Sequence, residues 1–270
     1  MDAGAERRFE LMPTTKIAAA ALEQFQQRLR RPPVMSSVAG SLPILFFGDA
    51  LAARLVTLGL NPSDQEYVDG LGAELVGERR RFHTLASLDT AKRDLLTQNQ
   101  CHRAIEMMRS YFAPGHPVFR WFRPLARVVE AMGASFIGRT AAHLDLVQES
   151  TRPVWSGLTK EQQTTLLAED LPFLRWQLGN LPARIVACNG ATVLSTVIDM
   201  TGAEVVSAGG LKRVRWTVAR AWMGTSRAVG VVGWNIPLTR PTGLGAAGER
   251  ELGALLVSEL QSANISNLKN

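Results

Sequence analysis

Cysteine and histidine are scarce in this 270-residue chain, which contains two cysteines and four histidines. The cysteines, Cys101 and Cys188, lie far apart and form no CxxC motif. Two cysteines are too few for a four-cysteine zinc or iron–sulfur site within one chain, and their separation argues against the disulfide framework of small secreted proteins. The histidines show no metal-ligand spacing either, so we expect no metal site and no cofactor.

Long apolar runs are missing too, because no window approaches the roughly 20 apolar residues of a membrane-spanning helix. The N-terminal residues carry early charges with no apolar stretch behind them, unlike a secretory signal peptide. Hydrophobic residues nevertheless make up 46% of the chain, which is ordinary for a globular protein with a real core. We expect a cytoplasmic protein, a monomer, with no membrane partner.

Lysine is rare, with five residues against 25 arginines, and the net charge is +6. The guanidinium fork of arginine matches the geometry of a phosphate group, so this excess favours a polyanionic partner such as nucleic acid. A genome that encodes arginine in place of lysine is the alternative explanation.

Short apolar segments alternate with longer segments of helical spacing along the chain. Helices are predicted over residues 15–30, 160–179, from 191 onward, and 246–262. Strands are predicted over residues 55–58, 140–147, 183–188 and 228–233, with a hairpin of short strands over 205–207 and 214–218, around Gly209 and Gly210. The alternation predicts an α/β fold, a three-layer α/β/α sandwich with a central, mostly parallel sheet of about four strands, plus extra helices.

The predicted domain organisation is a helical N-terminal extension over residues 1–36 and a single domain over 37–270. Residues 64–135 are predicted to be a largely helical insertion in that domain. Within it, aromatic and arginine residues interleave at Tyr111-Phe112 and over residues 119–123. This pattern is typical either of a nucleic-acid-binding surface or of an ordinary helix core.

Two unusual loops follow the first and the last predicted strand. The first reads Gly59-Leu60-Asn61-Pro62-Ser63, and the second reads Arg240-Pro241-Thr242-Gly243-Leu244-Gly245. Ser63 with Glu66 fits a capping box, which leaves Asn61 unexplained. In parallel sheets ligands bind outside the carboxyl ends of the strands, where both loops are expected to lie.

This pair of loops resembles the uracil-DNA glycosylase superfamily. Its members carry Gly-x-(Asn/Asp/Glu)-Pro-(Gly/Tyr/Ser) after the first strand and (His/Asn)-Pro-Ser-(Pro/Gly)-Leu-Ser near the C-terminus, and the mismatch-specific branch is the most similar. The resemblance spans residues 50–260 in element order and is specific at the two loops. It implies that residues 37–270 form a catalytic domain that flips a base out of DNA and excises it.

The resemblance also implies roles for the loop residues. Asn61 takes the position that handles the attacking water. Arg240 departs from the family's His or Asn, and it either stabilises the leaving base or grips a phosphate. Leu244 is either a wedge that fills the gap left by the flipped base or a buried loop leucine. Three further residues are expected to approach the DNA phosphates: Pro62, Thr242 and Gly243.

The expected base follows from three further positions. Ser63 leaves room at the C5 edge of a pyrimidine, where strict uracil enzymes of the family place a tyrosine. Asp145 accepts hydrogen bonds when ionised and suits the amino group of cytosine, unless it caps a helix or pairs with an arginine. Phe82 either stacks on the base or belongs to the core. Nearby arginines are expected either to grip phosphate or to be a solvated charge run: Arg79, Arg80 and Arg81.

The resemblance, with these residues, implies a monofunctional DNA glycosylase that uses water to excise a modified pyrimidine, leaving an abasic site. A C5-substituted cytosine is favoured and uracil comes next, in DNA repair or in antiviral defence. No lysine lies in either loop, which argues against a lyase step. The alternatives are a catalytically inactive nucleic-acid-binding protein on the same fold and an enzyme of small nucleotides, although the latter lacks a GxGxxG loop.

Overall fold

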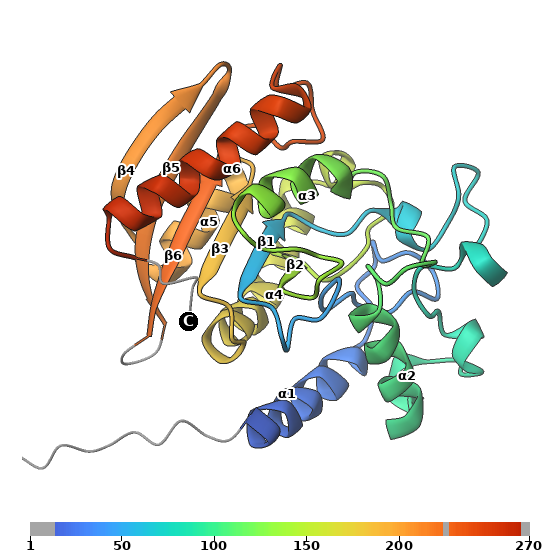
Figure 1. Cartoon of the computed structure of the whole chain (residues 1–270). Coiled ribbons are helices and arrows are strands. Elements are labelled where there is room, and N and C mark those ends of the chain that lie inside the picture. Colours follow the sequence, from blue (N-terminus) through green and yellow to red (C-terminus); the bar gives the residue numbers. More distant parts are fainter. Residues whose placement is uncertain (1–13, 224–226, 266–270) are drawn as a thin grey trace, which may run out of the picture.

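The computed structural model describes residues 14–223 and 227–265. At its centre is a six-stranded mixed sheet with the strand order β2-β1-β3-β6-β5-β4 (Figure 1). The first four of these strands are parallel, and the hairpin β5–β4 extends the sheet with antiparallel pairing. The strands are β1 (Leu55–Gly59), β2 (Ala141–Asp145), β3 (Ile185–Asn189), β4 (Glu204–Leu211), β5 (Val214–Met223) and β6 (Arg227–Trp234).

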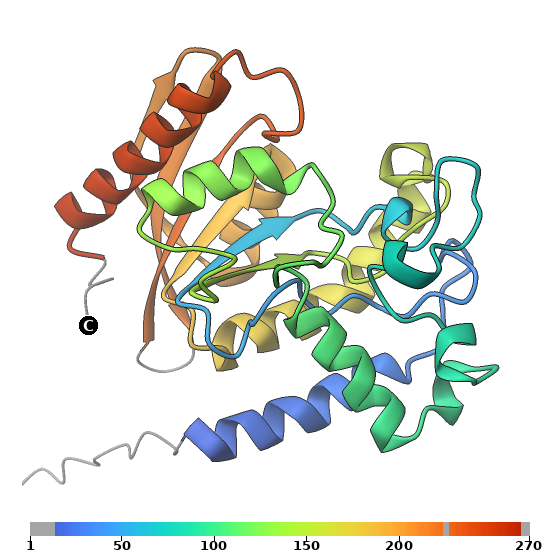
Figure 2. The same ribbon diagram turned by 45° about the vertical axis from the view of Figure 1, so that its right-hand side comes forward.

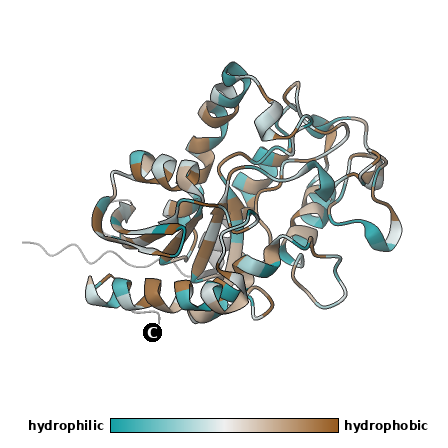
Figure 3. Ribbon diagram, turned by 90° about the horizontal axis from the view of Figure 1, so that it is seen from above, coloured by the Kyte–Doolittle hydropathy of each residue, from teal (hydrophilic) through white to brown (hydrophobic). Residues whose placement is uncertain are grey.

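Helices cover both faces of this sheet, which confirms the predicted three-layer α/β/α arrangement. On one face α3 (Phe122–Ala131) packs against α6 (Gly245–Ser262), and on the other face lie α4 (Lys160–Asn180) and α5 (Ala191–Thr201) (Figures 1 and 2). The strands β1, β2 and β3 are buried along their whole length, as expected of parallel strands covered on both sides. The view from above in Figure 3 shows the sheet between helices whose ribbons carry both hydrophobic and hydrophilic residues.

The antiparallel hairpin is longer than the sequence predicted, and its turn lies elsewhere. Gly209 and Gly210 are within β4, and the turn follows at Lys212, whose φ is +53°. Gly209 pairs with Trp216 on β5, and a side chain at Gly209 would collide with the Trp216 ring. The glycine therefore makes room for a cross-strand aromatic residue instead of making the turn.

The N-terminal helix α1 (Thr14–Leu29) shares the main hydrophobic core. Phe25 and Leu29 are fully buried, and the Phe25 ring packs edge-on against Trp176 of α4 at a centroid distance of 5.9 Å. The predicted extension is thus packed onto the rest of the chain, and α1 also contacts α2 (Gln98–Arg109).

The predicted largely helical insertion at residues 64–135 needs correction. It contains two α-helices, α2 and α3, together with four 3-10 turns, and the remainder is irregular chain. Tertiary hydrogen bonds fix this irregular part, such as the bond from the Tyr67 hydroxyl to the carbonyl of Leu42 (2.6 Å). Within the described part of the chain, no helix is long and apolar enough to cross a membrane.

Candidate active site

A pocket of about 420 Å³ opens at the carboxyl ends of β1, β2, β3 and β6. It brings together five residues that the sequence singled out: Asn61, Pro62, Ser63, Asp145 and Arg240. Its volume lies within the range of small-molecule sites in proteins. The pocket therefore opens at the edge of the sheet where ligands bind in parallel α/β folds.

Gly59, the last residue of β1, lies on the floor of this pocket and pairs in register with Asp145 of β2. A side chain at Gly59 would collide with the Asp145 carboxylate and would approach His143 Nε2 to 3.0 Å. The first residue of the Gly-x-Asn-Pro loop is thus a glycine because the Asp145 side chain occupies the space above it.

Asn61 is half-buried, and its amide is held in one orientation. Nδ2 donates to the carbonyl of Pro62 (3.1 Å) and to Oγ1 of Thr151 (3.2 Å), with a longer contact to the carbonyl of Glu149 (3.5 Å). These bonds occupy the nitrogen, while Oδ1 accepts no hydrogen bond from any described residue. The amide therefore offers an acceptor, which is the property needed to orient a water molecule.

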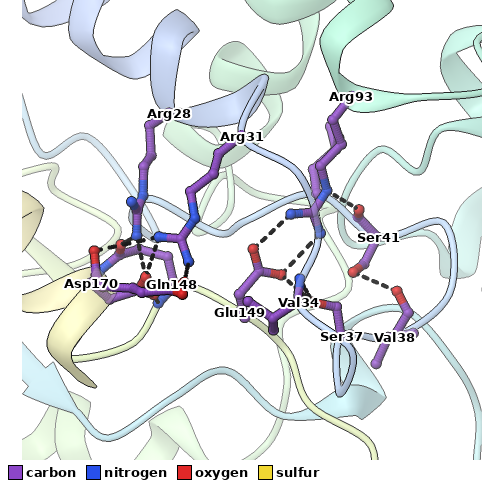
Figure 4. Close-up of polar contacts among 12 residues, drawn as sticks. Arg28, Arg31, Val34, Ser37, Val38, Ser41, Arg93, Gln148, Glu149 and Asp170 are labelled. Carbon is purple, nitrogen blue, oxygen red and sulfur yellow. Dashed lines mark hydrogen bonds and ion pairs between the residues drawn. The ribbon is translucent and has the colours of Figure 1, made fainter. Parts of the chain in front are cut away.

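The segment that holds Asn61 is itself anchored by buried ion pairs (Figure 4). Arg93 donates to both oxygens of Glu149, at 2.6 Å and 2.9 Å, and the two side chains are 1% and 2% exposed. The hydroxyl of Ser37 donates to the same carboxylate (2.8 Å). Next to it, Asp170 accepts the backbone N–H of Gln148 (2.6 Å) and pairs with two arginines, Arg28 and Arg31. Residues 148–151 thus form a rigid support for Asn61.

Asp145, the last residue of β2, is a buried acidic residue that lines the pocket. The residue is 3% exposed, and its Oδ2 has no hydrogen-bond partner in the described part of the chain. Its Oδ1 lies 3.4 Å from Nε2 of His143, whose Nδ1 is 2.7 Å from the hydroxyl of Thr57. Asp145 neither caps a helix nor pairs with an arginine there. A buried carboxylate oxygen without a partner is costly, so a donor on a ligand would stabilise it.

Asn189, the last residue of β3, is a pocket residue that the sequence reasoning missed. Its Oδ1 accepts from the Trp234 indole (2.8 Å) and from the backbone N–H of Leu238 (2.9 Å). The amide nitrogen donates to no described residue, so it remains available as a donor. Its position directly before Gly190, at the end of a buried strand, is the signal that could have identified it.

Strand register places Asp145 and Asn189 on either side of Gly59. Gly59 pairs with Asp145, and on its other side Leu58 pairs with Cys188, the residue before Asn189. Two strand spacings separate the outer backbones by roughly 10 Å. The floor of the pocket thus presents an acceptor and a donor with a side-chain-free position between them.

Glu66 lies behind the pocket wall and is fully buried. Burial raises the pKa of this carboxyl to about 8, against the opposing effects of Arg81 and of the Tyr111 hydroxyl, which lies 2.9 Å away. The group is therefore largely protonated at neutral pH. The predicted capping box is half right: Ser63 caps the turn by accepting from the N–H of Gln65 (3.2 Å), while Glu66 points inward to Tyr111.

Aromatic side chains line the wall above this floor: Phe119, Trp121 and Trp155. Trp121 is half-buried, stacks on Phe122 at 4.1 Å and meets the His143 ring edge-on at 5.0 Å. The flat aromatic surface expected from Phe82 is thus supplied by other residues.

Phe82 belongs to the core. It is 2% exposed, stacks on Tyr111 at 5.1 Å and meets Phe47 edge-on, and it does not line the pocket. This corrects the expectation that Phe82 stacks on a base. Neighbouring aromatic rings cover its apolar surface.

The second loop also differs from the expectation in part. Leu244 is 4% exposed and packs into the main core against Gly248, so in this structure it is a buried loop leucine and not a protruding wedge. Thr242 is buried as well, and its Oγ1 accepts from the N–H of Leu244 (3.2 Å). Gly243 is exposed with φ +73°, and Lys212 holds its carbonyl (3.1 Å).

The arginines divide into fixed and free side chains. Arg81 donates from Nε to the carbonyl of Pro117 (2.8 Å) and also bonds to the carbonyl of Gln65, so it joins two loops and is not a free phosphate grip. Arg79 is exposed, and neither Arg79 nor Arg80 lines the pocket. Arg240 is exposed at the pocket rim and makes no ion pair with the described residues.

No protein-family model and no curated protein matches the chain. In the described residues, no group of three or more His, Cys, Asp or Glu side chains is placed to hold a metal ion.

Proposed function

We propose that the protein is a monofunctional DNA glycosylase that excises a C5-substituted cytosine, with uracil the next candidate. The observation that carries the proposal is the buried, unpartnered Oδ2 of Asp145 on the floor of a strand-end pocket. A ligand with an amino group would supply the missing donor. The exocyclic amine of cytosine is such a donor, whereas the O4 of uracil or thymine is an acceptor that the carboxylate repels.

Asn189 supports the same choice of base. Its unpartnered amide nitrogen can donate to the acceptors N3 or O2 of cytosine, while Asp145 accepts from the amine. Ser63 lines the pocket with a small side chain, which leaves room for a substituent at C5. Trp121 provides an aromatic surface on the same wall for a flipped base.

Asn61 supports a hydrolytic mechanism at C1′. Its Oδ1 would accept a hydrogen bond from water and aim the water oxygen at the sugar carbon. The bond from C1′ to the base breaks first and its electron pair leaves with the base, and the water oxygen then bonds to the positively charged C1′. The water proton passes to solvent or to the departing base. An amide is a weak base, so this water attacks a sugar that already carries positive charge.

Arg240 suits the negative charge that develops on the leaving base. It is an exposed cation at the pocket rim, and it forms no ion pair with an acidic side chain in the described part of the chain. A positive charge near a developing anion lowers the barrier of the chemical step. The same guanidinium could instead hold a DNA phosphate, and the two roles differ in whether its loss lowers kcat or weakens binding.

The proposal is tested by strand scission on labelled oligonucleotides. These would carry uracil, thymine opposite guanine, 5-hydroxymethylcytosine or a glycosylated cytosine, and alkali would reveal abasic sites. Cleavage of a modified-cytosine strand that is lost in Asn61→Ala and kept in the control Asn180→Ala would support the proposal. Asn180 is an exposed residue at the end of α4, remote from the pocket residues.

Two other outcomes would change the account. Cleavage of uracil alone would keep the enzyme and refute the reasoning from Asp145 and Ser63. DNA binding with no excision of any base would favour a nucleic-acid-binding protein that lacks catalysis.

A further inference from the structure

A second hollow, of about 600 Å³, runs along the outer side of α3 next to the candidate active site. We call it the α3 groove, defined by six of its residues: Phe112, Phe119, Phe122, Ala126, Phe136 and Ile137. Phe119 lines both the groove and the strand-end pocket, so the two hollows adjoin. The Arg81 guanidinium lies 5.2 Å above the Phe119 ring and helps to hold this shared wall.

The walls of the α3 groove are largely apolar and aromatic. Phe112 and Phe136 stack on each other at 4.4 Å, and Phe122 meets Phe112 edge-on at 4.9 Å. At the rim, Ile137 is 71% exposed and extends the apolar surface of the groove toward solvent. Such walls suit flat apolar groups, nucleobases included.

The charges at the groove favour an anionic occupant. Arg120 and Arg123 both line it, both are exposed, and neither makes an ion pair with a described residue. Glu130 is the acidic residue of the lining, and it lies toward the far end of α3. An apolar trough flanked by free guanidinium groups matches the bases and phosphates of a nucleic-acid strand.

The dimensions limit how much of a strand can bind. Phe122 and Glu130 are the first and last lining residues on α3, and a separation of eight residues corresponds to about 12 Å of helix. At roughly 3.4 Å for each stacked nucleotide, the groove accommodates about three of them.

We infer that the α3 groove binds the unpaired nucleotides on one side of the target base. This inference rests on the proposed function in one respect: the target base of the same strand would occupy the adjoining pocket. Binding of a strand in the groove does not depend on base excision, because Arg120 and Arg123 do not line the strand-end pocket. The groove would therefore give the enzyme a preference for single-stranded DNA flanking the target.

The test compares two double variants in a binding assay that requires no excision. Arg120→Ala/Arg123→Ala removes the two groove cations, and Arg175→Ala/Arg184→Ala removes two exposed arginines elsewhere. Arg175 lies on α4, on the opposite face, and Arg184 precedes β3, at the other end from the pocket. Fluorescence anisotropy would give the Kd for single-stranded oligonucleotides of ordinary bases over a series of salt concentrations.

The groove variant is expected to bind about tenfold more weakly, and the slope of log K against log salt should fall by about 1.4, for two lost phosphate contacts. The control variant should change neither quantity comparably. Equal weakening in the two variants would overturn the inference, as would no weakening in either. Circular dichroism of each variant confirms that it is folded.

A second measurement separates this inference from the proposed function. In excision assays on single strands, extending the DNA on one side of the target should lower KM for the wild type and not for the groove variant. Selective loss of DNA binding with no excision of any base would keep the groove and refute the glycosylase. Excision whose KM is the same for both double variants would keep the glycosylase and refute the groove.

Discussion

Replacing Arg93 with methionine is expected to destabilise the fold by about 3–5 kcal/mol, because the change leaves the Glu149 carboxylate buried without its cation. The structure gives the magnitude its basis: the two side chains are 1% and 2% exposed and share two hydrogen bonds of 2.6 Å and 2.9 Å. Arg93 also donates from Nε to the carbonyl of Ser41 (3.0 Å), which would lose its partner as well.

Urea unfolding followed by circular dichroism measures this effect, with two reference variants. Arg139→Met removes an arginine that is 62% exposed and pairs with Asp49. Asp49 retains its ion pair with Arg109 in this variant. The free energy of unfolding should therefore fall by only about 0–1 kcal/mol. Arg93→Met/Glu149→Leu replaces both buried charges and should recover most of the loss. The reasoning is refuted if Arg93→Met costs no more than Arg139→Met, or if the double variant is less stable than the single one.

Three further predictions concern the pocket. Gly59→Ala should cost about 1–3 kcal/mol in urea unfolding through overpacking against the Asp145 carboxylate, and Gly59→Ala/Asp145→Ala should recover part of it; an additive double variant would contradict this. Asp145→Asn should shift excision from modified cytosine toward uracil by about 5- to 150-fold, the equivalent of 1–3 kcal/mol, in competition assays; unchanged preference would remove Asp145 from base recognition. Because the folded pKa of Glu66 is raised from 4.5 to about 8, the folded state binds more protons between these values, so stability should fall as pH rises through this window. Glu66→Gln should flatten that slope in unfolding measurements from pH 5 to 8, and an unchanged slope would refute the buried, protonated carboxyl.

The parallel strands could be predicted because their central residues form short apolar runs buried on both faces, as residues 55–58 and 185–188 illustrate. The site at their carboxyl ends followed from the same alternation and from the unusual position of Asn61. The turn of the β4–β5 hairpin could not be predicted from its glycines, because Gly209 is required by the Trp216 ring on the neighbouring strand.

Residues whose roles depend on tertiary contacts were predicted least well. Leu244 and Phe82 lie in motifs that suggested exposed functions, yet both belong to the main hydrophobic core. The position of Asn189 at the end of a strand could have been read from the sequence, but the orientation of its amide depends on Trp234 and Leu238, which are distant in sequence. The irregular segment before α3 is held by bonds such as Arg81 to the carbonyl of Pro117, and helical periodicity carries no information about these.

The most direct test of the central claim is to identify the product by mass spectrometry. Purified protein would be incubated with DNA that contains 5-hydroxymethylcytosine or its glycosylated form, beside Asn61→Ala and Asn180→Ala. The account predicts free modified cytosine base and abasic DNA with the wild type and Asn180→Ala, and little free base with Asn61→Ala. Intact DNA in every sample, or release of nucleosides or nucleotides in place of free base, would contradict it.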